Sequence, residues 1–260
     1  MILLVGGIFA YAHRTRIETS APRGIPDVTV LDARKPPSLV QKIPVLVYHS
    51  VAPAPAGAEG PMNRHYRVSP DNFDRQMKYL ADNGYYPIRF DTYADYLLHD
   101  IPIPEKPIVI TFDDGLENQY AYAAPVLKKY GFTATFFVYP GVTGHKRFMT
   151  ESEIKELSDA GHEIASHTYI HENLPKLTDP AIIHRELVTS KELLEKMTGK
   201  PVTTIAYPFY AENEAARGWV RDAGYVAARA GWQPFENSAD EIFHLKAQEV
   251  VDTANPFAKK

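Results

Sequence analysis

Short apolar runs alternate with amphipathic stretches along most of the chain. Runs of about four to eight apolar residues bounded by polar or turn residues are typical of buried strands. Such runs occur at 44–49, 107–112, 133–139, 162–166, 202–207 and 225–229. Between them, apolar residues three or four positions apart predict helices over 69–84, 119–130, 150–161, 179–198 and 212–223. This alternation predicts a parallel sheet with helices outside it, built as a barrel or as a doubly wound sheet.

Local capping signals place the starts of two of these helices. Ser69 is a good N-cap, Pro70 suits the first helical position, and Gly84 ends the same helix. Thr150 and Glu153 have the spacing of a capping box, in which each side chain bonds to the backbone N–H of the other residue. We therefore expect these two helices to form at the predicted positions.

The first 42 residues differ from the rest of the chain. Residues 1–12 are apolar, and a basic stretch follows them at 13–16. Twelve helical residues span about 18 Å, short of the roughly 30 Å bilayer core, and a secretory signal carries its positive charge before the apolar run. We interpret the segment as a clipped or unusual export anchor, with a buried strand as the alternative, so we predict an extracytoplasmic or membrane-anchored protein. Residues 19–41 have a linker-like composition, which leaves an N-terminal segment over 1–42 and one domain over 43–260.

Composition narrows the chemistry available to this domain. The chain has 28 Lys and Arg residues against 32 Asp and Glu, a net charge of −4. It therefore lacks the basic footprint of a nucleic-acid-binding protein. With no Cys among 260 residues, disulfide scaffolds, zinc ribbons and thiol nucleophiles are excluded. Any metal ion must be bound by His, Asp or Glu, and nothing in the sequence indicates a protein partner.

Polar clusters follow three of the expected strands, where functional groups of α/β folds collect. The clusters are Thr111–Gly115, Ser166–His171 and Ala206–Tyr210. His167 and His171 have a metal-ligand spacing of four residues, with a surface or capping pair as the alternative. Adjacent carboxylates at Asp113 and Asp114 are unfavourable after an apolar strand unless paired or metal-bound, with a helix cap and turn as the alternative. Jointly, one Asp and two His describe an open catalytic site for Zn²⁺ or a similar divalent ion.

Three motifs resemble the leading motifs of a known family: TFDDG, SHTYIH and AYPFY, in this order and spacing. The family is the polysaccharide deacetylases, carbohydrate esterase family four, also called the NodB-homology domain. The upstream segment IPVLVYHSV resembles the bacterial branch that includes biofilm poly-N-acetylglucosamine deacetylases. The resemblance covers residues 43–229 and implies a distorted (β/α)-type barrel of about seven parallel strands in a single domain.

The resemblance also implies roles for individual residues. Asp113 is expected to be the general base, and Asp114, His167 and His171 are expected to bind one divalent metal ion. Zinc is the first expectation for that ion, with cobalt, nickel and manganese as alternatives. The resemblance places Thr168 beside the second motif, where its hydrogen bonds would hold the loop.

The third motif supplies the expected oxyanion and substrate-groove residues. The backbone N–H of Phe209 is expected to help hold the oxyanion, and Tyr207 and Tyr210 are expected to line the groove. The motif departs from the family pattern at two positions. Ala206 stands where many members have an Arg that tethers the catalytic Asp, and Tyr210 stands where Gly is usual.

The proton donor is left open between two histidines. His244 lies in the nearest match to the last family motif, with altered flanking residues, and a structural role is the alternative. His49 follows the first strand and should end on the same face of the barrel as the other site residues. We place His244 slightly ahead of His49.

These features predict a metal-dependent hydrolase that removes N-acetyl groups from an N-acetylated glycan. The same machinery cleaves esters, so an O-acetyl esterase acting on xylan-like polymers is the second hypothesis. An inactive sugar-binding module of the same fold is the third, because the tethering Arg is missing and the acid is uncertain. Retention of all three expected ligands together with Asp113 favours an enzyme.

Overall fold

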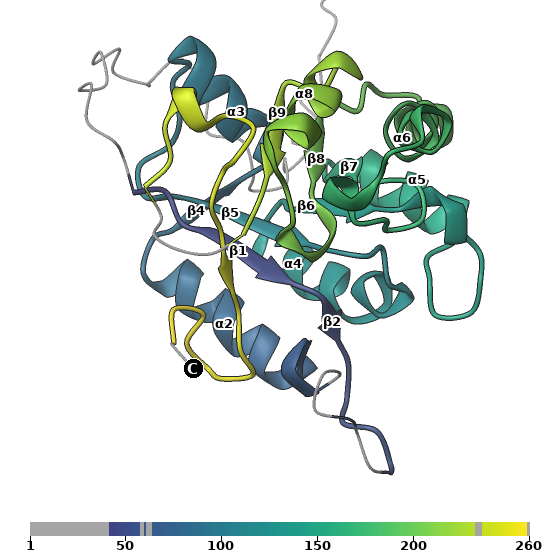
Figure 1. Ribbon diagram of the computed structural model, residues 1–260. Coiled ribbons are helices and arrows are strands. Elements are labelled where there is room, and N and C mark those ends of the chain that lie inside the picture. Colours follow the sequence, from purple (N-terminus) through teal and green to yellow (C-terminus); the bar gives the residue numbers. More distant parts are fainter. Residues whose placement is uncertain (1–41, 58–59, 61–63, 232–235, 259–260) are drawn as a thin grey trace, which may run out of the picture. The chain divides into compact units, whose positions relative to one another are not determined.

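The computed structural model describes residues 42–57, 60, 64–231 and 236–258 (Figure 1). The largest sheet has its strands in the order β10-β1-β5-β6-β7-β8-β9, all paired in parallel, and β4 pairs with the first half of β5. Its strands are β1 Val45–Tyr48, β4 Tyr86–Ile88, β5 Pro107–Phe112, β6 Thr135–Val138, β7 Glu163–Ser166, β8 Thr204–Ala206, β9 Ala227–Arg229 and β10 Gln248–Glu249. A small second sheet pairs β2 Ser50–Val51 with β3 Arg67–Val68.

The segment after β9 brings the two edges of the sheet together. Leu245 forms a parallel bridge with Arg229 at the end of β9, and a few residues later β10 pairs with β1. The sheet therefore curls into a distorted (β/α)-type barrel, and the predicted fold class is confirmed.

Helices pack along the outside of the sheet (Figure 1). They are α2 Pro70–Asp82, α3 Phe90–His99, α4 Ala124–Tyr130, α5 Glu151–Asp159, α6 Pro180–His184, α7 Ser190–Thr198 and α8 Glu214–Asp222. Two π-helical turns, Gln119–Ala123 and Arg185–Thr189, lead directly into α4 and α7. The Ser69 hydroxyl accepts a hydrogen bond from the Asn72 N–H, and Thr150 and Glu153 form the predicted capping box.

Successive side chains of the strands enter two different apolar clusters. Leu46 and Tyr48 pack in the larger cluster, which includes residues of α2, α4, α5 and α7. Val45 and Val47 pack in the smaller one, which includes residues of α3. This alternation is the two-residue period of a strand that is buried on both faces.

His162 lies just before β7, at the opposite end of that strand from His167. Its Nδ1 is 3.1 Å from the Ala134 backbone nitrogen and accepts that N–H. The ring packs edge-on against Phe136, with the centroids 5.4 Å apart. Burial lowers the pKa of His162 to about 4, so the neutral ring is the form present at neutral pH.

The sequence did not predict the helix α3 or the short strands β2, β3, β4 and β10. Residues 1–41, which include the expected anchor and linker, lie outside the described residues. None of the helices in the described part of the chain has the length and apolar character needed to span a bilayer.

Candidate active site

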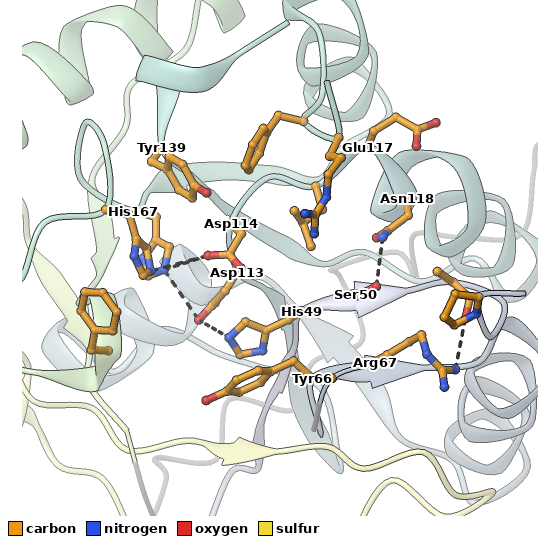
Figure 2. Close-up of a pocket in the computed structure, with 18 of the residues that line it drawn as sticks. His49, Ser50, Tyr66, Arg67, Asp113, Asp114, Glu117, Asn118, Tyr139 and His167 are labelled. Atoms are coloured by element: carbon orange, nitrogen blue, oxygen red, sulfur yellow. Dashed lines mark hydrogen bonds and ion pairs between the residues drawn. The ribbon is translucent and has the colours of Figure 1, made fainter. Parts of the chain in front are cut away.

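The polar strand ends meet at one end of the barrel, around a cavity of about 860 Å³. Asp113 and Asp114 reach this cavity from the end of β5, His49 from the end of β1, and His167 from the end of β7. Phe209 enters it from the turn that follows β8. The three clusters expected from the sequence therefore share one site, and Figure 2 shows Asp113 between His49 and His167.

The side chains of Asp114, His167 and His171 converge in this cavity. Asp114 Oδ1 lies 3.7 Å from His167 Nε2 and 3.6 Å from His171 Nε2. One ligand atom from each residue lies within 4.8 Å of the other two. The other ring nitrogen of His167, Nδ1, is 2.8 Å from the Ala206 carbonyl oxygen. A carbonyl can only accept, so Nδ1 carries the proton and Nε2 keeps the lone pair that a metal ion needs.

The protonation states of these groups suit a cation. Burial and the charge of Asp113 raise the pKa of Asp114 to about 7. Burial lowers the pKa of His167 to about 3 and also lowers that of His171. Both imidazoles are thus neutral at pH 7, as metal ligands must be, and the Asp114 charge is disfavoured beside Asp113. A divalent ion would compensate that charge, so the set of one oxygen and two nitrogen donors fits an ion such as Zn²⁺.

Backbone strain is concentrated around the cavity. The φ angles of Asp114, Thr168, His171, Phe209 and Tyr210 are 77°, 63°, 68°, 58° and 55°. Non-glycine residues adopt this left-handed region at a cost of about 1–3 kcal/mol each, and they cluster at functional sites. The Thr168 hydroxyl oxygen accepts the His171 N–H at 3.1 Å, so Thr168 holds the loop as the sequence predicted.

Asp113 is the most enclosed carboxylate of the site, with 2% of its surface exposed. Its Oδ2 accepts a hydrogen bond from Arg229 Nη2, and its Oδ1 is buried with no hydrogen-bond partner among the described residues. Burial alone would raise the pKa of Asp113, but Arg229, followed by His167 and His49, holds it below its ordinary value. Asp113 is therefore an ionised carboxylate: its Oδ2 faces Arg229, His49 and His167, and its enclosed Oδ1 is an acceptor without a donor among the described residues.

Arg229 was missed by the sequence analysis. It is fully buried at the end of β9, and its guanidinium lies between the rings of Phe137 and Tyr210, 5.2 and 5.3 Å from their centroids. Its register partner on β8 is Ala206, the position where many family members carry Arg. The cation that Ala206 cannot supply thus comes from the neighbouring strand. The signal in the sequence is an Arg that ends the otherwise apolar strand 225–229.

Of the two candidate proton donors, His49 is the one that the structure brings to Asp113. Its Nε2 lies 3.8 Å from Asp113 Oδ2, and its ring packs on Tyr66 with the centroids 4.5 Å apart. Tyr66 in turn contacts His65, whose Nε2 is 3.2 Å from Glu249 Oε2. Burial and the charge of Asp113 raise the pKa of Glu249 to about 7. His49 therefore lines the cavity, and its ring packs on Tyr66, which contacts the His65–Glu249 pair.

The structure does not bring His244 into the cavity, contrary to expectation. His244 follows the turn Ala239–Glu241, and its Nδ1 lies 2.8 Å from Glu212 Oε1.

The expected groove residues differ in what they can contact. Phe209 is 62% exposed, and its ring centroid lies 4.6 Å from that of His171, so this residue is open to solvent beside the three converging ligands. Tyr207 is among the residues that line the cavity, but it is fully buried and its hydroxyl donates to the Phe243 carbonyl at 3.1 Å. The Tyr210 ring lines the cavity but packs inward over Arg229.

Comparison with known proteins agrees with the site. The family model "Polysaccharide deacetylase" matches residues 100–228. Bacillus subtilis YxkH, which carries the name of a polysaccharide deacetylase, is 37% identical over 184 residues, 71% of this chain and 62% of its own length. The poly-β-1,6-N-acetyl-D-glucosamine N-deacetylase of Staphylococcus aureus is 31% identical over 176 residues, 62% of this chain and 60% of its own length. This chain thus spans less than two thirds of either relative.

A solved structure extends the likeness to almost the whole of another protein. The Streptococcus pyogenes deacetylase PplD in complex with acetate superposes with a TM-score of 0.73 at 27% identity, covering 82% of this chain and 94% of the chain in that structure. The family match therefore includes all three motifs. From its motifs, its fold and these relatives, the chain belongs to the polysaccharide deacetylase family.

Proposed function

We propose that this protein is a metal-dependent deacetylase that hydrolyses the amide C–N bond of N-acetyl groups on a glycan. The observation that carries the proposal is the convergence of Asp114, His167 and His171 beside the buried carboxylate of Asp113. A pure sugar-binding module has no use for three converging ligands next to a buried, ionised carboxylate. The name of the Staphylococcus aureus relative supports a polymer of β-1,6-linked N-acetylglucosamine as the first substrate to test.

The residues that line the cavity would have separate roles in such a hydrolysis. Asp114, His167 and His171 would hold the divalent ion, which when bound activates water and polarises a carbonyl. Asp113 would accept the proton of the attacking water, while Arg229, which donates to Oδ2, keeps the carboxylate ionised. The Phe209 backbone N–H would stabilise the oxyanion, as backbone donors do in acyl transfer.

An amine leaves readily only when its nitrogen is protonated, so a proton donor is needed on the substrate side. We assign this role to His49, because it lines the cavity 3.8 Å from Asp113. The exposed Phe209 ring would pack against an apolar face of the sugar next to the acetamido group.

The test is acetate release by the purified chain after removal and stepwise return of the metal. Zn²⁺, Co²⁺, Ni²⁺ and Mn²⁺ are added separately to the metal-free protein with β-1,6-linked N-acetylglucosamine oligomers, chitin oligomers or acetylated xylan. Metal-dependent release from the N-acetylated oligomers supports the proposal, and Asp113→Asn should abolish most of it. Release from acetylated xylan alone indicates the O-acetyl esterase, and metal binding without any release indicates an inactive binding module.

We further propose an extracytoplasmic or membrane-anchored protein in which residues 1–42 precede the catalytic domain 43–260. The support is the apolar composition of 1–12 and the linker-like composition of 19–41. Fractionation of cells that express the chain with and without residues 1–42 tests this proposal, which loses its support if both forms remain in the cytoplasm.

A further inference from the structure

The loop that carries His167 and His171 has an unfavourable backbone conformation. Thr168 and His171 both have left-handed φ angles, 63° and 68°, although neither is glycine. In isolation this loop would relax toward negative φ angles. Relaxation would turn the His171 ring away from Asp114, so something outside the loop must hold it.

A buried carboxylate on the adjacent helical segment binds the middle of the loop. Glu186 Oε2 accepts the backbone N–H groups of Tyr169 and Ile170, each at 3.0 Å. The Glu186 side chain has no exposed surface, and its other oxygen lies 3.0 Å from Arg185 Nη2. Glu186 belongs to the π-helical turn Arg185–Thr189, and π-helical turns in α-helical segments are frequent at functional sites.

Four residues further along, Ser190 binds the beginning of the same loop. Its hydroxyl donates to the Thr168 carbonyl at 2.9 Å and lies 2.9 Å from the Ser166 hydroxyl. Ser190 is fully buried as well. Glu186 and Ser190 thus bind consecutive parts of the loop from one helical segment.

A glycine limits the loop on another side. The Gly141 N–H donates to the Tyr169 carbonyl at 2.8 Å. A Cβ at Gly141 would lie 2.6 Å from that carbonyl oxygen and 2.6 Å from the Ile170 side chain. The loop therefore has no room to shift toward residue 141.

We propose that Glu186 and Ser190 are positioning residues for the metal centre: they hold the 167–171 loop in its left-handed conformation so that His167 and His171 converge on Asp114. The inference rests on the proposed metal site and deepens it. A carboxylate with no exposed surface is costly in a protein core unless its hydrogen bonds are used. Here two of those bonds go to the backbone between the two histidines.

The test measures metal binding by purified variants, without reference to substrate. Zn²⁺ affinity is measured by competition with a chelator, and the visible absorption of the Co²⁺-loaded protein reports the geometry of the ligands. Glu186→Leu removes both acceptors, Glu186→Gln keeps the shape and one acceptor oxygen, and Ser190→Ala removes the second contact. Glu192→Gln, on the exposed face of the same helix, is the matched acidic control, and Leu194→Ala is a core control for lost stability.

Glu186→Leu should weaken Zn²⁺ affinity about 10–100-fold and alter the Co²⁺ spectrum, since second partners of metal ligands have effects of this size. Glu186→Gln should be intermediate, Ser190→Ala should weaken affinity in the same direction, and both controls should retain wild-type affinity. If Leu194→Ala, at an equal loss of melting temperature, weakens Zn²⁺ binding as much as Glu186→Leu, the role of Glu186 is merely structural and the inference is overturned.

Wild-type affinity in Glu186→Leu would overturn the inference too, as would a wild-type chain that binds no divalent ion. A wild-type chain that binds zinc but releases no acetate would refute the proposed function alone, because the metal-binding comparison does not depend on turnover.

Discussion

Replacing Arg229 by Met should leave the buried carboxylate of Asp113 without its cationic partner and so destabilise the fold. Both side chains are buried, with 0% and 2% of their surfaces exposed, so little solvent is present to take over the role of the guanidinium. Met fills much of the space between the rings of Phe137 and Tyr210, so an empty cavity should add little to the loss in the free energy of unfolding. Removing one partner of a buried ion pair costs about 3–5 kcal/mol in the free energy of unfolding.

A double-mutant cycle isolates the electrostatic part of this effect. Urea unfolding of the metal-free wild type, Arg229→Met, Asp113→Asn and the double variant is compared at pH 7. Arg229→Met should cost much less in the Asp113→Asn background, giving a coupling free energy of about 2–3 kcal/mol. Arg221→Met is the control, because Arg221 packs on the Phe243 ring at the surface, and a surface change of this kind alters stability by about 0.5 kcal/mol.

The coupling should also depend on pH in one direction. The folded-state pKa of Asp113 lies below its ordinary value of 3.8, so the pair stabilises the fold above that value. The stabilisation is lost as the pH falls through the folded-state pKa. Additive single-variant effects at pH 7, with no measurable coupling, would refute the idea that Arg229 holds Asp113 in its ionised form.

Further expectations concern the metal, the base, the acid and acid stability. His171→Ala should lose zinc and acetate release together, whereas Asp113→Asn should keep zinc and lose about 10²–10⁴ in rate, as measured by metal analysis and turnover. His49→Ala should impair N-acetyl cleavage far more than cleavage of an activated ester, and His244→Ala should impair neither; the opposite pattern would return the acid role to His244. Burial lowers the pKa of His162 from 6.5 to about 4, so the unfolded chain binds the proton at a higher pH than the folded protein does. The free energy of unfolding should therefore fall by about 3 kcal/mol as the pH falls from 6.5 to 4. His162→Gln should flatten that part of the pH dependence in urea unfolding, and an unchanged slope would contradict the assignment.

The elements predicted from the sequence are those whose signals are local. The helix Pro70–Asp82 begins at its own N-cap, Ser69, and strand Pro107–Phe112 has the predicted bounds. Helix α3, Phe90–His99, was missed because its first residues are bound by distant side chains. The Phe90 N–H donates to Thr135 Oγ1 at 2.8 Å, and the Asp91 N–H donates to Glu163 Oε2 at 3.0 Å. Its N-cap, Arg89, makes no side-chain capping bond, so no local signal marked the start.

In the candidate site, too, the residues with local sequence motifs were predicted and those placed by distant parts of the chain were not. Asp114, His167 and His171 were identified because the motifs place them after the strands β5 and β7, and the structure brings them together. The choice between His49 and His244 could not be made from spacing, because it depends on where the chain runs after β9. Arg229 had no motif of its own, and only strand register relates it to Asp113.

The register pair Ala206 and Arg229 has a consequence for how relatives of this protein are recognised. Residues 206 and 229 lie on neighbouring strands at the same level of the sheet, so the cation that pairs with Asp113 is specified by a location in space rather than by a place in the sequence. In this chain the charge stands on the neighbouring strand, while the barrel and the remaining motifs are retained. A search that requires Arg in the third motif would discard this chain as degenerate, although the cation is present one strand away. Members that lack Arg at that position should therefore be inspected at the end of the next strand before they are classed as inactive.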